Sequence, residues 1–239
     1  MRILAVDAAT ERCSVALLSG EELIGRVAER GLAHAEQILG MVDGVLAEAG
    51  VSLSMLDGIA ASIGPGAFTG VRISVVVAQG LAFGADLPVI PVTTLEALAY
   101  QSMRSGAAHA LACLDARMGE VYWGCFAADP LKGLVVTSAA RVGPPDSVVL
   151  PAVALPAAAL PAGVVYRGIG RGFAAYPALA ALPGLHLAPE DREALPDARE
   201  FAALGARRLG NGEGQDPADL RPLYLRDKVA LTEAERGVK

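Results

Sequence analysis

Aromatic side chains are scarce in this sequence, where Phe, Tyr and Trp together make up 5% of 239 residues. Few rings are therefore available to stack on the bases of a single-stranded nucleic acid. Positive charge is also in short supply, because 20 Lys and Arg face 26 Asp and Glu and leave a formal net charge of −6. Domains that bind nucleic acid on their own usually carry a basic surface, so we expect any contact with RNA to depend on another protein.

Histidine and cysteine are rare as well, with three residues of each type. The cysteines are odd in number and widely spaced, which is typical of reduced thiols in a cytoplasmic protein: Cys13, Cys113 and Cys125. Ile38 stands four residues after His34, so this predicted helix carries no HxxxH pair of metal ligands. His109 and His186 are isolated, and there is no Gly-x-Ser-x-Gly elbow. The sequence therefore predicts neither a metal site nor a catalytic residue.

Long hydrophobic runs are missing too, although hydrophobic residues make up 53% of the chain. The longest apolar stretch spans residues 73–90. Three residues interrupt it and argue against a transmembrane segment: Gln79, Asp86 and Pro88. Asp7 comes too early for a signal peptide. We therefore expect a folded cytoplasmic protein with a sizeable core and no membrane association.

Glycine, in contrast, is abundant, and three glycines stand in the most informative stretch of the chain: Gly64-Pro65-Gly66-Ala67-Phe68-Thr69-Gly70-Val71-Arg72. We predict an apolar strand at 57–63 before this glycine turn and a helix over Thr69–Gly84 after it, with Thr69 as the N-cap. The spacing matches neither a P-loop, which needs Lys and Ser or Thr after its last glycine, nor the dinucleotide-binding GxGxxG motif. Two interpretations remain open: a tight turn without a ligand, or an anion site in which Arg72 takes part.

The order of predicted elements indicates an α/β lobe of the ribonuclease-H-like kind. Three strands come first, and helices then alternate with strands, in the order βββαβαβα. The predicted ranges are strands 2–8, 14–18, 23–27, 57–63 and 88–92 and helices His34–Ala49, Thr69–Gly84 and, capped by Thr94, about 94–103. An antiparallel meander followed by right-handed βαβ units is characteristic of such a lobe.

A second lobe repeats the opening of the first. A strand at 110–114 leads into another at 120–126, and Asp115 takes the place that Asp7 has in the first lobe. The repeat is weak in residue identity and clear in layout. It predicts that the chain folds into two related lobes.

The rest of the second lobe gives fewer signals, because residues 144–187 are rich in Ala, Pro and Gly. We predict a strand near 164–166 and a helix that begins at Asp197, with the spacing of a capping box, and reaches Leu209. The predicted divisions are a first lobe at 1–104, a second lobe at 105–226 and a flexible tail at 227–239.

The helix after the glycine turn is apolar on almost every face, which predicts that it is buried on the side away from its own sheet as well. Gly80 and Gly84 are four residues apart, as are Gly40 and Gly44 on the preceding helix, so two helices could approach closely there. Either a partner subunit or the second lobe of the same chain would cover these helices. The predicted partner interface consists of His34, Ile38, Val42, Val45, Val71, Val75, Gln79 and Phe83.

Polar residues at the ends of the first strand of each lobe are candidates for chemistry. Asp7 and Thr10 stand where actin-like kinases hold a metal–phosphate pair, although an aspartate there often only caps a turn. Asp115, Arg117 and Glu120 cluster around a hairpin and could equally form a local ion network.

Three segments together resemble the bacterial TsaB (YeaZ) family: the Asp7-x-x-Thr10 start, the glycine turn with Ile73, and residues 115–122. The resemblance covers about the first 125 residues and returns at 168–170 and 222–226. It implies a two-lobed actin-like (ASKHA) fold with a degenerate second lobe and no catalytic power of its own. The motif positions, which also form a candidate vestigial phosphate site, are Asp7, Thr10, Gly64, Gly66, Thr69, Gly70, Arg72, Asp115, Arg117 and Glu120.

The resemblance also implies a function and partners. Members of the family pair with TsaD, which carries the HxxxH metal site and transfers threonylcarbamoyl to tRNA, and the ATPase TsaE joins them. We therefore expect a non-catalytic scaffold subunit that forms a homodimer when alone, binds no cofactor by itself and meets ATP, metal and tRNA only through its partners. The product is threonylcarbamoyladenosine beside the anticodon of tRNAs that read codons beginning with A. The alternatives are an ATP-dependent small-molecule kinase of the same fold and an M22-type metallopeptidase.

Overall fold

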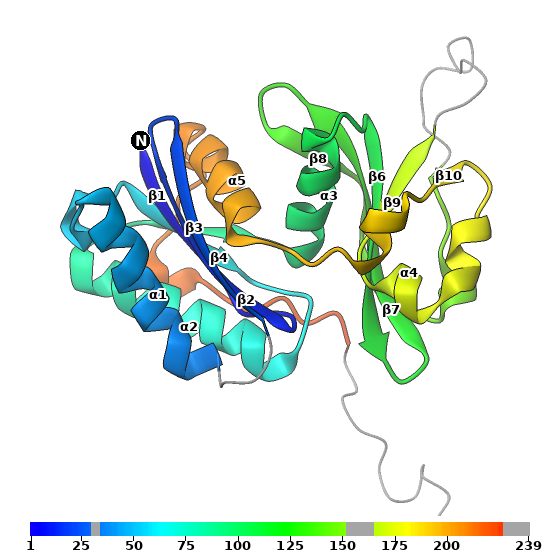
Figure 1. Cartoon of the computed structure of the whole chain (residues 1–239), viewed down its shortest axis with the longest axis horizontal. Coiled ribbons are helices and arrows are strands. Elements are labelled where there is room, and N and C mark those ends of the chain that lie inside the picture. The colour runs from blue at the N-terminus through cyan, green and yellow to red at the C-terminus, as the bar shows by residue number, and fades with distance from the viewer. Residues whose placement is uncertain (30–33, 152–164, 227–239) are drawn as a thin grey trace, which may run out of the picture.

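Two five-stranded sheets, seen in Figure 1, form the framework of the computed structural model, which describes residues 1–29, 34–151 and 165–226. The first sheet has the strand order β3-β2-β1-β4-β5. The central strand β1 runs antiparallel to β2 and parallel to β4. Its strands are β1 (Arg2–Asp7), β2 (Arg12–Ser19), β3 (Glu22–Glu29), β4 (Gly58–Ser62) and β5 (Val89–Val92). The predicted order of elements in the first half of the chain is confirmed.

The second sheet, β10-β9-β6-β7-β8, has the same arrangement around its central strand β6, which is antiparallel to β7 and parallel to β9. The strands are β6 (His109–Arg117), β7 (Glu120–Asp129), β8 (Gly133–Gly143), β9 (Tyr166–Ile169) and β10 (Leu185–His186). The sequence did not predict β8 and β10. The predicted strand near 164–166 begins at Tyr166, and residue 164 lies outside the described residues.

Helices cover the outside of the first sheet and fill the space between the two sheets (Figure 1). α1 (His34–Ala49) and α2 (Phe68–Ala85) lie on the outer face of the first sheet. Between the sheets, α3 (Thr94–Arg104) packs on the second sheet, and α5 (Ala198–Gly210) packs across β1, β2, β4 and β5 of the first. On the outer side of the second sheet, α4 (Gly172–Ala175) has only four residues.

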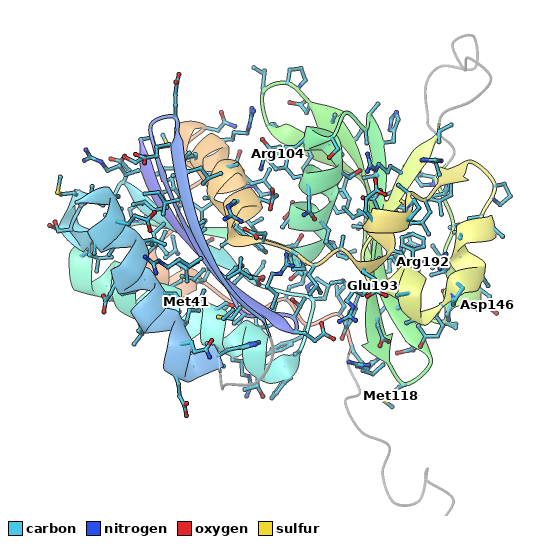
Figure 2. All side chains as sticks on the ribbon, viewed as in Figure 1. Met41, Arg104, Met118, Asp146, Arg192 and Glu193 are labelled. Atoms are coloured by element: carbon cyan, nitrogen blue, oxygen red, sulfur yellow. The ribbon has the colours of Figure 1, made fainter. Side chains whose placement is uncertain are left out.

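Two helices pack on the sheet formed by the other half of the chain: α3, from the predicted lobe 1–104, packs on the second sheet, and α5, from the predicted lobe 105–226, packs on the first. The apolar face of α5 comes from the second half of the sequence but covers the first sheet, where Phe201 and Leu204 are fully buried in the core between the lobes. A Cβ at Gly205 would lie 2.7 Å from the Ala60 Cβ, so this helix lies very close to β4. Side chains fill the space between the sheets (Figure 2). The predicted tail, 227–239, lies outside the described residues.

Two of the three predicted helix caps are wrong by one or two residues. Ala67 is the N-cap of α2 and makes no side-chain hydrogen bond, whereas Thr69 lies inside the helix and is exposed. α3 is capped by Thr93, whose Oγ1 accepts a hydrogen bond from the Glu96 amide at 3.1 Å while Glu96 accepts one from the Thr93 amide at 2.8 Å. Thr94 is the first helical residue and is fully buried. Asp197 caps α5 as predicted.

Candidate functional site

The glycine turn joins β4 to α2 and packs against the end of β1. A Cβ at Gly66 would overlap the Ala9 carbonyl oxygen, and a Cβ at Gly70 would overlap that of Ala8. The amide of Ala67 donates a hydrogen bond to the Ala9 carbonyl oxygen at 2.8 Å. Close approach of two backbone segments therefore accounts for these two glycines without a ligand.

Two further motif residues of the turn, Gly64 and Arg72, also have partners within the chain. Gly64 has a φ of +94°, and its carbonyl oxygen accepts a hydrogen bond from the Thr94 amide at 2.9 Å. Arg72 Nε donates a hydrogen bond to the Tyr224 hydroxyl at 2.9 Å. The Arg72 guanidinium also lies 3.7 Å from the centre of the Phe68 ring, within the range of a cation–π interaction. Arg72 thus holds an aromatic pair at the start of α2.

Asp7 ends β1 and is fully buried. Its Oδ1 accepts a hydrogen bond from the Ala9 amide at 3.0 Å. Burial raises the pKa of Asp7 to about 6, although the Ala9 amide and the Ser62 hydroxyl favour the charged form. This carboxyl does not line the cleft between the lobes, so the structure does not place it where a kinase would hold a metal–phosphate pair.

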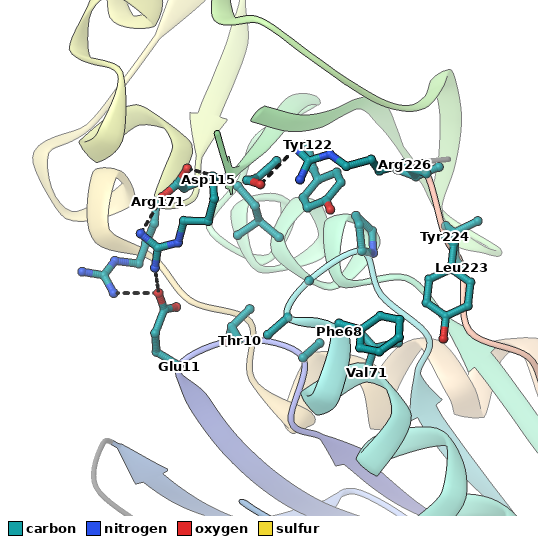
Figure 3. A pocket seen from close by; sticks show the side chains of 18 residues that line it. Thr10, Glu11, Phe68, Val71, Asp115, Tyr122, Arg171, Leu223, Tyr224 and Arg226 are labelled. Carbon is teal, nitrogen blue, oxygen red and sulfur yellow. Dashed lines mark hydrogen bonds and ion pairs between the residues drawn. The ribbon is translucent and has the colours of Figure 1, made fainter. Parts of the chain in front are cut away.

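A cleft with a volume of about 380 Å³ lies between the two lobes and is shown in Figure 3. Three parts of the chain line it: the ends of β1 and of the glycine turn, the β6–β7 hairpin with the end of β9, and the C-terminal segment 223–226. Thr10 lies near its centre in Figure 3. Such a volume is within the range of small-molecule sites, about 300–1,000 Å³.

Charged side chains from both lobes meet at one end of the cleft. Glu11 Oε1 of the first lobe lies 3.4 Å from Arg117 and 3.7 Å from Arg171 of the second. Each arginine has a second, closer partner: Asp115 at 2.9 Å from Arg117, and Glu193 at 3.0 Å from Arg171. This Glu11–Arg117–Arg171 cluster is an ionic connection between the lobes.

The C-terminal segment 223–226 ties the lobes together along the opposite side of the cleft. The Leu223 amide donates a hydrogen bond to the Ile63 carbonyl oxygen of the first lobe at 2.7 Å. Arg226 binds the Glu120 carboxylate and donates a hydrogen bond to the Ala116 carbonyl oxygen at 3.1 Å in the second lobe. This segment therefore spans the cleft.

The structure brings together only part of the predicted phosphate site. Among the motif residues, the cleft is lined by Thr10, Gly66, Asp115 and Arg117. Glu120 reaches its edge through Arg226, whereas the turn and β1 residues Asp7, Gly64, Thr69, Gly70 and Arg72 do not line it. Sequence reasoning missed Glu11 and Arg171 as site residues, because neither belongs to a spaced motif. Arg171 directly follows the singled-out Gly168-Ile169-Gly170, which was the available signal.

Most residues of the predicted partner interface have contacts within this chain. Five of its eight residues face the first sheet and are buried in this chain's own core: Ile38, Val42, Val45, Val71 and Val75. Gln79 donates hydrogen bonds to the carbonyl oxygens of Pro217 and Leu220. The sequence shows that α2 is apolar on almost every face, but it does not show which of these faces packs on the first sheet.

The outer face of α1 and α2 includes Phe83 of the predicted interface and five residues that were not in it. Val76 is 64% exposed and Phe83 60%, and Leu39 of α1 is exposed too. Among the residues that the structure describes, no atom outside the helix's own backbone and the neighbouring residues lies within 4 Å of a Cβ built at Gly40, Gly80 or Gly84. We call these six residues the outer helix face. Gly44 does not belong to it, because the Arg26 side chain covers it.

The cysteines and the possible metal ligands form no further candidate site among the described residues. The three cysteines are buried and unpaired, and burial raises the pKa of Cys13 to about 11 and of Cys125 to about 12, so these thiols stay protonated at neutral pH. Within residues 1–29, 34–151 and 165–226, no three His, Cys, Asp or Glu side chains are grouped to hold a metal ion. One described helix, α2, is long and apolar enough to cross a membrane by length and composition alone, and it packs on the first sheet.

Comparisons with known proteins agree with the resemblance of the motifs. A family profile described as TsaD, tRNA N6-adenosine threonylcarbamoyltransferase, matches residues 26–142. The chain is 36% identical to the tRNA threonylcarbamoyladenosine biosynthesis protein TsaB of Escherichia coli over 232 residues, 96% of each chain. It is 45% identical to the TsaB protein of Haemophilus influenzae over 126 residues, 52% of each chain.

A solved structure shares the fold over almost the whole length. YeaZ from Pseudomonas aeruginosa superimposes with a TM-score of 0.82 at 37% identity, covering 94% of this chain and 99% of that one. Two mixed sheets in the same topology, the glycine turn and the full-length identity thus lead to one assignment. The chain belongs to the TsaB (YeaZ) family, with a TsaD-like, ASKHA-type α/β fold.

Proposed function

We propose that this protein is a non-catalytic scaffold subunit in the biosynthesis of threonylcarbamoyladenosine in tRNA. The observation that carries the proposal is the 36% identity, over 96% of both chains, to a protein named for that pathway. The profile named for the threonylcarbamoyltransferase TsaD matches residues 26–142, which relates this chain to the enzyme that would be its partner. In this proposal the product is the modified adenosine next to the anticodon of tRNAs that read codons beginning with A.

The outer helix face supports the choice of partner. Its exposed apolar side chains and uncovered glycines would let two helices of a TsaD-like subunit approach α1 and α2 closely. In the absence of that subunit, a second copy of this chain would cover the same face. A TsaE-like ATPase then joins the pair in the cytoplasm, and ATP, metal and tRNA are bound through the partners.

The burial of Asp7 supports a subunit without catalysis of its own. A kinase would need this carboxylate in the cleft, next to magnesium and phosphate, whereas here its environment favours the neutral form. The short α4 and the two-residue β10 are consistent with a second lobe reduced from an active ancestor. The kinase alternative predicts magnesium-dependent ATP binding and turnover by the isolated protein, which calorimetry and a phosphate-release assay would detect.

The interface is tested by aspartate substitutions on α2. Val76→Asp should abolish co-purification with the TsaD-like subunit while the chain stays folded, because Val76 is 64% exposed. Val136→Asp is the matched control: this valine is 53% exposed on β8, away from α1 and α2, and should leave the complex intact. Val75 is only 4% exposed, so Val75→Asp would unfold the chain and report nothing about the partner.

The role is tested by reconstitution. The TsaD-like and TsaE-like subunits, ATP and a tRNA should form threonylcarbamoyladenosine only when this chain is added, and the Val76→Asp variant should fail to support the reaction. Normal complex formation by that variant would disprove the interface. Full modification without this chain would disprove the scaffold role.

A further inference from the structure

The exposed side of α2 continues beyond the outer helix face towards the start of the helix. Phe68 and Arg72 stand eight and four residues before Val76, and residues four apart are neighbours on one side of a helix. All three side chains are exposed, that of Phe68 to 48%. A continuous strip of accessible side chains therefore runs along α2 from Phe83 to the first helical residue.

A residue of the C-terminal segment extends this strip. Tyr224 is 51% exposed, and its ring centre lies 5.8 Å from that of Phe68, as Figure 3 shows. The Tyr224 hydroxyl accepts the 2.9 Å hydrogen bond from Arg72 Nε, and the Arg72 guanidinium lies 3.7 Å from the centre of the Phe68 ring. Each of these three residues contacts the other two, and we call them the aromatic cluster.

The outer helix face is too small to hold a partner by itself. Its large apolar side chains are Leu39, Val76 and Phe83, which are between 51% and 64% exposed, and its other three members are glycines. A stable interface covers about 800 Å² on each partner, whereas even a fully buried Phe contributes only about 150–250 Å². A partner that binds the outer helix face must therefore cover neighbouring surface as well.

The chemistry of the aromatic cluster suits an interface. Tyr, Phe and Arg are enriched where proteins meet, and Tyr and Arg often contribute a large share of the binding energy. Arg72 is the only charged residue of α2, and its contacts with Phe68 and Tyr224 hold its side chain in place before a partner arrives. A side chain that is already ordered loses little conformational entropy on binding.

We propose that the TsaD-like subunit docks on the aromatic cluster as well as on the outer helix face, and so contacts the C-terminal segment 223–226. This inference rests on the proposed scaffold function. The partner's surface there would be apolar against the rings of Phe68 and Tyr224, with a carboxylate facing Arg72, because a covered guanidinium needs an acceptor. Segment 223–226 is bonded to both lobes, so the partner would hold this chain where its lobes meet.

The test measures the affinity of the whole chain for the TsaD-like subunit by isothermal titration calorimetry. Phe68→Ala and Tyr224→Ala should each weaken binding at least about 10-fold, because a ring at the interface is lost. Arg72→Glu should weaken binding more than Arg72→Gln does, since it places a negative charge against the partner's carboxylate. The matched control is Leu131→Ala: this leucine is 80% exposed between β7 and β8 of the second sheet, and the variant should bind as wild type does.

Hydrogen–deuterium exchange of the wild-type chain gives a readout that needs no variant. Residues 68–72 and 223–226 should exchange more slowly in the complex than in the chain alone, while residues 130–132 should exchange equally in both. Unchanged exchange at 223–226, or unchanged affinity of both alanine variants, overturns the proposal.

These outcomes are distinct from those that test the scaffold role. If Val76→Asp abolishes the complex while Phe68→Ala and Tyr224→Ala bind normally, the outer helix face remains the interface and only the aromatic cluster is removed from it. If the wild-type chain forms no complex with the TsaD-like subunit, the scaffold role and this inference are both overturned.

Discussion

Asp7 shows how burial changes what a single residue can do. At the sequence level it is a carboxylate at the end of a strand, which suits a metal–phosphate site. In the structure it is fully buried behind the Ala8–Ala9 backbone and the glycine turn, and its pKa rises to about 6. The residue type is that of an active kinase, but the environment favours the neutral acid.

The raised pKa of Asp7 predicts a pH dependence of stability. Well below pH 3.8 the group is protonated in both the folded and the unfolded chain, and no stability is lost. As the pH rises through the unfolded value of 3.8 towards the folded value of about 6, the unfolded chain ionises first, so the free energy of unfolding falls. Above about pH 6 the loss is complete and is of the order of 3 kcal/mol.

Asp7→Asn removes this titration and retains an acceptor for the Ala9 amide. The difference in the free energy of unfolding between variant and wild type should therefore shift in favour of the variant between pH 4 and pH 7. Urea denaturation at several pH values measures this shift. A difference that stays constant over the range would show that Asp7 titrates normally.

At the scale of elements, the position of α2 is set by backbone contact. Gly66 and Gly70 let the start of the helix touch Ala8 and Ala9, and the buried side chains of Val71 and Val75 then point into the sheet. The outer helix face is what remains exposed after this placement. The glycine turn thus determines which side of α2 is available to a partner.

Gly70→Ala should destabilise the protein strongly, because the added methyl group would meet a backbone carbonyl that cannot move aside. Overpacking of this kind costs about 1–3 kcal/mol, and more where the backbone must shift. Gly80→Ala in the same helix is the control: a Cβ there meets no atom of the described part of the chain within 4 Å, so the better helix propensity of Ala should add up to about 1 kcal/mol. Urea unfolding of both variants measures the contrast, and equal midpoints would contradict the proposed packing.

The helix caps illustrate the limit of local patterns. The sequence predicted a helix with Thr94 as its N-cap, whereas in the structure the N-cap is the preceding residue, Thr93. Only the structure shows that Glu96 reaches back to Thr93, while the Thr94 hydroxyl is buried 3.3 Å from that of Ser62. Either of two adjacent threonines could cap the helix on local grounds. The contact of Thr94 with Ser62, which is far away in the sequence, determines that Thr93 is the cap.

In the whole molecule, each half of the chain supplies a helix that covers the other half's sheet. α5 packs on the first sheet, and α3 packs on the second. The face of the first sheet that α5 covers carries fully buried side chains such as Ile3 and Ile90. An ion pair links these two helices, because Arg208 Nη2 of α5 lies 2.5 Å from Glu96 Oε1 of α3. Each sheet is therefore covered by a helix from the other half of the chain.

A fragment of residues 1–104 should consequently fail to fold alone, since it would expose the face that α5 covers. Co-expression with the fragment 105–239 should restore the structure by supplying α5. Dispersion of the amide signals in a proton–nitrogen NMR spectrum distinguishes the cases. Native-like dispersion for 1–104 alone would contradict this dependence on α5.

The sequence by itself determined the elements of the first lobe, their order and the family, because periodicity, glycine spacing and short motifs are local properties of the chain. Only the tertiary structure decided which face of each helix is covered, that Asp7 is withdrawn from the cleft, and that Glu11 meets Arg117 and Arg171. These features depend on contacts between residues far apart in sequence. No local sequence pattern encodes these features, because the burial of a side chain depends on which other part of the chain packs against it.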